Sequence, residues 1–195
     1  MTHAIEALAS PTATGFTDAY ALQTIRMFEK NIVEAVQNGQ NVKARMEMLQ
    51  ASTMGITAFS FALNAIPVHN LAHAYGALFR IPHGLANAVF LPHVIELVQD
   101  LYLPKIEELA KALNLDTRGK TPQTLLMDVV AKIRALQAEV GLPNDFASYE
   151  IPADSMETII AAVQSDPAAL NFPLPAPLIE AIGQRVANVK SPQET

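Results

Sequence analysis

Apolar residues recur at intervals of three and four along most of this chain, and this spacing is the feature that most limits its fold. The clearest run has its apolar residues on one face of a helix: Leu126, Val129, Ile133, Leu136 and Val140. Alternation with a period of two, which is typical of half-buried strands, is nearly absent. Only the segment 147–151 has a strand-like composition, and it is too isolated to predict a strand. The pattern therefore predicts an all-α helical bundle.

Capping residues and prolines indicate where these helices begin and end. The predicted helices cover about 18–38, 41–65, 104–114, 121–140, 155–164 and 176–188. Asp18, Asn41 and Thr121 are placed to cap the N-termini of three of them, and Pro122 is favoured at a first helical position. A glycine near a helix end, as at Gly141, is typical of a C-terminal stop. Most of the 13 prolines fall between the helices.

The composition is that of a folded domain without a nucleic-acid partner. Half of the 195 residues are hydrophobic and 16% are charged, which excludes a largely disordered chain. The formal net charge of −6 disfavours binding to nucleic acid, which requires a basic surface. No repeat or internal boundary interrupts the pattern. We expect a single helical domain over residues 1–195.

Several kinds of site and location are excluded by what the sequence lacks. Without cysteine, any metal must be held by histidine and carboxylate groups. No Gly-x-Gly-x-x-Gly segment is present, so a nucleotide-binding Rossmann unit is not expected. The first residues do not resemble a signal peptide, and the most apolar stretch, 56–68, is too short to cross a bilayer. We expect no membrane association and a cytoplasmic location.

Three of the five histidines lie close together, at His69, His73 and His83. A spacing of four places His69 and His73 on the same face of a helix. His83 stands between Pro82 and Gly84, as expected of a side chain presented at a break between helices. Each could be an ordinary core or surface histidine. Their concentration also favours a metal-binding or acid–base role, because imidazole serves in both.

The segment 69–94 carries a longer pattern: His-x-x-x-His, then Pro-His-Gly-x-Ala-Asn-Ala, then Leu-Pro-His-Val. This pattern resembles the signature of the iron-containing (group III) alcohol dehydrogenases. Thr2-His3-Ala4-Ile5-Glu6-Ala7 resembles the second ligand motif of that family, Asp-x-x-x-His-Ala-x-Glu-Ala. The resemblance is strong over about residues 1–100 and loose afterwards. It implies the fold of the C-terminal domain of the dehydroquinate synthase-like and iron-containing alcohol dehydrogenase group.

The resemblance also implies roles for particular residues. The metal ligands of the family fall on His3, His69 and His83, and His73 corresponds to a histidine that moves or orients a proton near the substrate. Spacing alone would pair His69 with His73 instead and cannot decide between the two sets. The glutamate at Glu6 is not a ligand in the family, and we expect it on the solvated surface of a helix.

The implied activity is metal-dependent oxidation of small alcohols, or reduction of the corresponding aldehydes, with NAD(P) as the hydride carrier. Iron is the expected divalent metal and zinc is an alternative. The family's fourth ligand, an aspartate four residues before the first histidine, would fall before residue 1, and so would its nucleotide-binding α/β domain. We therefore expect weak metal occupancy and no activity from this chain alone.

Other interpretations remain open from the sequence. The chain could be a non-catalytic helical module for assembly, and exposed apolar surface makes a homo-oligomer expected in either case. A hydrolytic site with three histidines would need a general base that the sequence does not indicate. His93 is interpreted as structural. Phe79 and Phe90 either line the substrate pocket or belong to the core.

Overall fold

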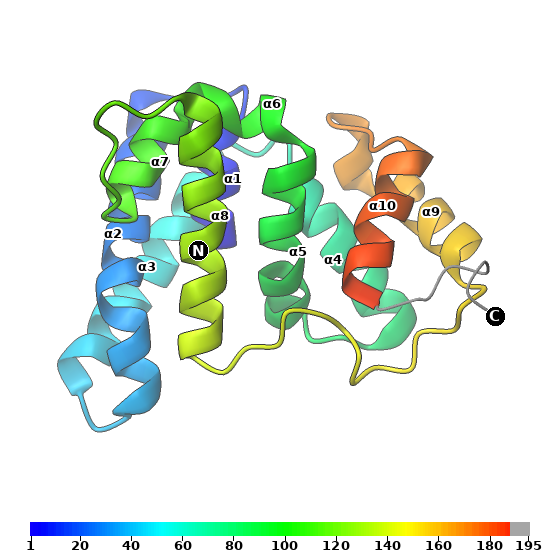
Figure 1. Cartoon of the computed structure of the whole chain (residues 1–195), viewed down its shortest axis with the longest axis horizontal. Coiled ribbons are helices and arrows are strands. Elements are labelled where there is room, and N and C mark those ends of the chain that lie inside the picture. The colour runs from blue at the N-terminus through cyan, green and yellow to red at the C-terminus, as the bar shows by residue number, and fades with distance from the viewer. Residues whose placement is uncertain (188–195) are drawn as a thin grey trace.

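The computed structural model of the protein describes residues 1–187 and shows helices joined by short turns and loops (Figure 1). The elements in chain order are α1 (Thr2–Ala9), α2 (Gly15–Gln37), α3 (Val42–Phe61), α4 (Pro67–Phe79), α5 (His83–Leu97), α6 (Gln99–Tyr102), the 3-10 helix η1 (Leu103–Lys105), α7 (Ile106–Ala112), α8 (Pro122–Glu139), α9 (Met156–Ser165), the 3-10 helix η2 (Pro167–Leu170) and α10 (Ala176–Ala187). No strand occurs within residues 1–187, and the predicted all-α fold is confirmed. Residue 188 of the last predicted helix and residues 189–195 of the expected domain lie outside the described residues.

The start of α2 differs from the prediction. Thr14, not Asp18, is the N-cap: Thr14 and Thr17 exchange side-chain and backbone hydrogen bonds in a capping box. Asp18 lies in the first turn of the helix, where its carboxylate accepts a hydrogen bond from Lys105 Nζ at 2.9 Å. The sequence rule favours Asp and Thr alike as caps, so it does not distinguish Thr14 from Asp18.

Three other helix ends agree with the prediction, whereas the helix predicted over 41–65 ends earlier, at Phe61. The Asn41 side chain accepts a hydrogen bond from Ala44 N at the start of α3, and Thr121 accepts one from Thr124 N at the start of α8. Beyond the end of α8, Gly141 has a φ of 72°, a left-handed conformation that glycine adopts without strain. Local capping chemistry therefore fixed these boundaries.

α5 is the central helix of the molecule. Figure 1 shows it between α8 on one side and α4 and α10 on the other, and it contacts all three. Its buried residues are distributed around its whole circumference, which is the pattern of a helix covered on several sides. One continuous cluster of buried apolar residues extends from Ala4 to Val186 through both sides of the molecule. α5 thus fixes the position of its first residue, His83.

A group of aromatic rings packs beside α5. Phe90 is fully buried, with its ring centroid 4.8 Å from that of Tyr75 and 5.2 Å from that of Phe146. Phe79 is half-buried and packs on Tyr75 at 5.5 Å. Phe90 therefore belongs to the core, which is the second of the two roles that the sequence left open for it, and Phe79 packs against the edge of the core.

The outer face of α3 carries a stripe of exposed apolar side chains. Val42, Met46, Leu49 and Ile56 are 70%, 52%, 65% and 41% exposed. The opposite face of α3 is made of small buried residues that pack on α2. The helix is thus apolar on both sides, although only one side is covered in the described part of the chain.

Within residues 1–187, no helix combines the length and the apolar character needed to cross a bilayer.

Candidate functional site

Four histidine rings lie together where α1, α4 and the first turn of α5 meet. The ring centroid of His69 is 4.6 Å from that of His3, 5.4 Å from that of His83 and 6.3 Å from that of His73. The rings of His73 and His83 are stacked at 5.5 Å. The structure therefore brings together all four histidines that the resemblance singled out. Their roles as ligands and proton carrier remain predictions.

The local sequence explains how these rings converge. Pro67 is the first residue of α4, so His69 and His73 follow on consecutive turns of one helix. Arg80 ends that helix in a left-handed conformation with a φ of 56°. The chain then reverses through Pro82 and begins α5 at His83. The short turn between the two helices places His83 opposite His69.

His93 lies outside this cluster. It is on α5, half-buried, and lines a separate cavity of about 210 Å³ together with Arg134, Asn144 and Arg185. Its interpretation as a structural histidine is not tested by this position.

Glu6 was predicted to lie on a solvated helix surface, and this prediction is wrong. Its side chain is fully buried. One carboxylate oxygen, Oε1, accepts a hydrogen bond from the backbone N–H of Val68 at 2.7 Å, and the other, Oε2, is in close hydrogen-bond contact with Nδ1 of His69. Exposure is the usual state of glutamate, and the sequence offers no signal for partners more than 60 residues away.

Burial lowers the pKa of three histidines of the cluster, His3, His69 and His83, and so favours their neutral form. It lowers the pKa of His69 to about 3, with a smaller effect from the charge of His73. Burial also lowers the pKa of His3 to about 4, and the neighbouring His69 adds to the effect. The pKa of His83 is lowered in the same direction, by burial and then by His69 and His73. Burial raises the pKa of the Glu6 carboxyl group.

The electrostatics and donor atoms of this group fit a divalent ion that accepts imidazole ligands. Neutral imidazole is the form that coordinates a metal, and three histidines are an accepted ligand set for zinc. Among the described residues, however, no group of three His, Cys, Asp or Glu side chains is arranged to hold an ion as it stands. The rings of His3 and His69 are stacked with an interplanar angle of 16°. The ring nitrogens of two parallel stacked rings do not point toward a common centre. At least one of the two side chains would therefore have to rotate before both rings could coordinate one ion.

His73 is at the exposed edge of the cluster, and the sequence did not indicate its partner. Its Nδ1 lies 3.2 Å from a carboxylate oxygen of Asp166, which follows α9. Both residues line a cavity of about 390 Å³ that also contains Leu63, Ile66 and Asn171. His73 therefore borders a space large enough for a small organic molecule.

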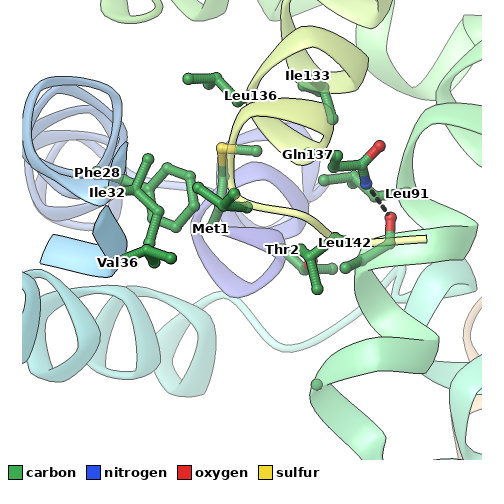
Figure 2. Close-up of a pocket in the computed structure, with 13 residues that line it drawn as sticks. Met1, Thr2, Phe28, Ile32, Val36, Leu91, Ile133, Leu136, Gln137 and Leu142 are labelled. Carbon is green, nitrogen blue, oxygen red and sulfur yellow. Dashed lines mark hydrogen bonds between the residues drawn. The ribbon is translucent and has the colours of Figure 1, made fainter. Parts of the chain in front are cut away.

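A second cavity, of about 300 Å³, lies on another side of the cluster and is largely apolar. Figure 2 shows Met1 at its centre, between Phe28 and Ile32 of α2 and Leu136 of α8. Its lining also includes the chain neighbours of two cluster histidines: Thr2, which precedes His3, and Gly84, which follows His83.

An all-helical fold with four histidines gathered at the junction of three helices defines a recognisable class of domain. The chain belongs to the iron-containing alcohol dehydrogenase family: residues 1–179 match the family model described as Fe-containing alcohol dehydrogenase family, C-terminal. The resemblance that the histidine motifs indicated is thereby confirmed.

Individual relatives agree with this assignment. The 1,3-propanediol dehydrogenase of Citrobacter freundii is 38% identical over 144 residues, which are 74% of this chain and 37% of that protein. A probable alcohol dehydrogenase of Escherichia coli (strain K12) is 39% identical over 142 residues, 73% of this chain and 34% of that protein. The crystal structure of a 1,3-propanediol oxidoreductase superposes with a TM-score of 0.85 at 32% identity, and the match covers 93% of this chain and 48% of that one. The chain thus spans less than half the length of these relatives.

Proposed function

We propose that this chain is the metal-binding, helical part of a nicotinamide-dependent alcohol dehydrogenase that interconverts small alcohols or diols and their aldehydes or ketones. The observation that supports the proposal is the cluster of His3, His69, His73 and His83 beside a cavity of about 390 Å³. The names of the relatives, which are alcohol and propanediol dehydrogenases, agree with this substrate class.

In this proposal His3, His69 and His83 hold one divalent ion. When bound, such an ion would supply Lewis-acid polarisation of the substrate oxygen. The three residues contribute neutral imidazoles and no carboxylate, which suits zinc better than the harder ferrous ion and implies weak occupancy. Their part is to fix the ion beside the cavity that His73 lines.

His73 is proposed to hold and move a proton at the edge of that cavity. Its Nδ1 faces the Asp166 carboxylate, so its other nitrogen, Nε2, is left to exchange a proton with the substrate or with water. The apolar side chains Leu63 and Ile66 would contact the carbon skeleton of the substrate, and Asn171 offers a polar group. We place the binding of NAD(P) in a part of the enzyme outside these 195 residues, because no phosphate-cradling glycine motif is present here.

Measurement of the bound metal tests the proposed ligands directly. After equilibration with zinc and removal of the free ion, we expect His83→Ala to retain clearly less zinc than the wild-type chain when both are measured by elemental analysis. His83 is exposed, so its removal should leave the fold intact. His93→Ala, a histidine outside the cluster, is the matched control and should retain the wild-type amount. An unchanged metal-to-protein ratio in His83→Ala would count against the ligand assignment.

The apolar stripe on α3 favours a second candidate function, that of a helical assembly module. Val42, Met46, Leu49 and Ile56 form a face that is not covered in residues 1–187, and contiguous apolar surface of this kind drives association. We propose that this face mediates self-association, which would accompany the enzymatic function or, in a non-catalytic domain, replace it.

The oligomeric state tests this second candidate. We expect the wild-type chain to sediment as a dimer or larger species, and the double variant Met46→Glu, Leu49→Glu to sediment as a monomer, because two buried carboxylates would disfavour the contact. Gln50→Glu adds a charge at an exposed polar position of the same helix and should leave the association unchanged. A monomeric wild-type chain would exclude the assembly role.

A further inference from the structure

Among residues 1–187, Glu6 is the one fully buried carboxyl group that contacts the histidine cluster. It is one turn beyond His3 on α1, and its side chain crosses to the beginning of α4. A buried carboxyl group is costly unless each oxygen has a partner. Here each oxygen has one, and the two partners are consecutive residues of α4, Val68 and His69.

The contact with Val68 has a structural explanation. Val68 is in the first turn of α4, whose first N–H groups have no partner within the helix, and the N-cap residue Ile66 supplies no side-chain hydrogen bond. The Glu6 side chain therefore caps this helix from a distant part of the chain. This role needs only one of the two oxygens.

The contact between Oε2 and Nδ1 of His69 is made by a side-chain atom, so helix capping does not explain it. A carboxylate beside Nδ1 leaves Nε2 as the only ring nitrogen available to a metal ion. Carboxylates occupy this place behind metal-binding histidines generally, where they fix the orientation and tautomer of the ring. The ring is further confined by Phe59 and His3, whose centroids each lie 4.6 Å from that of His69.

We propose that Glu6 is a positioning residue for the metal site, which holds His69 with its proton on Nδ1 and its Nε2 directed to the ion. The inference rests on the proposed function, since it assigns to Glu6 a task toward the same ion. It also reverses the expectation from the sequence, in which this glutamate was a solvated surface residue.

The zinc affinity of two variants tests the assignment. Glu6→Leu removes both contacts, and Glu6→Gln leaves one carbonyl oxygen for two donors. We expect each to raise the zinc dissociation constant by about 10–100-fold, the usual effect of losing a partner behind a metal ligand. The measurement is competition with a chelating dye at neutral pH, with circular dichroism to confirm the fold. Asp166→Asn, which alters the carboxylate beside the non-ligand His73, is the matched control and should bind zinc as the wild type does.

A spectroscopic measurement on the unaltered protein separates positioning from capping. In the zinc-loaded wild-type chain, long-range proton–nitrogen NMR correlations should show His69 protonated at Nδ1 and coordinated through Nε2. Coordination through Nδ1, or wild-type zinc affinity in folded Glu6→Leu, would overturn the role of Glu6 and leave the proposed function standing. If the wild-type chain bound no zinc, the proposed function would fail, and the role of Glu6 toward an ion would fail with it.

Discussion

Replacing Phe90 with alanine is expected to lower the free energy of unfolding by about 3–5 kcal/mol, the range for removing a large aromatic side chain from a packed core. Phe90 is fully buried and makes edge-to-face contacts with Tyr75 and Phe146. The first lies on α4 and the second in the segment after α8, so the ring joins three parts of the chain. Its removal would leave a cavity that these neighbours cannot fill without moving.

Urea unfolding followed by circular dichroism measures this loss. Phe61→Ala provides the matched control, because Phe61 is 69% exposed at the end of α3 and should change the free energy of unfolding by less than about 1 kcal/mol. Equal losses in the two variants would mean that Phe90 is not a core residue. A domain of this kind is stabilised by only about 5–15 kcal/mol in total. The Phe90→Ala change should therefore also increase the mobility of α5 and of His83 at its first position.

His69→Ala is expected to have the largest effect on metal binding. Loss of a partner behind a ligand alone weakens binding by about 10–100-fold, so loss of the central ligand should weaken zinc binding by more than about 100-fold. The same change should destabilise the metal-free chain. His69 is buried, and its removal leaves Glu6 Oε2 without a partner inside the protein, which costs about 1–3 kcal/mol.

The comparison with His83→Ala makes this prediction specific. His83 is exposed and does not contact Glu6, so His83→Ala should weaken zinc binding with little effect on metal-free stability. Zinc titration of both variants gives their two dissociation constants. Urea unfolding of both variants in the absence of metal gives their two free energies of unfolding. If His69→Ala bound zinc with wild-type affinity, the cluster would not contain the proposed site. If it bound no zinc yet unfolded like the wild type, the buried pair with Glu6 would contribute nothing to stability.

The helices could be predicted from the sequence because their signals are local. Asn41 and Thr121 cap the helices that they were expected to cap. Four residues of the predicted apolar stripe lie on the buried face of α8: Leu126, Val129, Ile133 and Leu136. The start of α2 could not be predicted because two residues of suitable chemistry, Thr14 and Asp18, compete for the cap. In the structure Thr14 forms the cap together with Thr17, and Asp18 pairs instead with Lys105, which is 87 residues away in the chain.

Only part of the candidate site could be predicted from the sequence. Helical spacing placed His69 and His73 on one face, but their association with His3 came from the family motifs, since periodicity carries no information about contacts between helices. Glu6 and Asp166 were missed for a related reason. Each is an ordinary acidic residue in its own helix or turn, and its histidine partner is 63 or 93 residues away.

The gathering of His3, His69 and His83 from three helices has a thermodynamic consequence. An ion held by all three would act as a cross-link that closes a loop of about eighty residues, a geometry that the unfolded chain adopts rarely because of its entropy. Metal binding would therefore be coupled to folding. At a free ion concentration a hundred times the dissociation constant, the folded state would gain about 2.7 kcal/mol. Loss of the ion would remove the cross-link between α1, which carries the proposed ligand His3, and the helices α4 and α5.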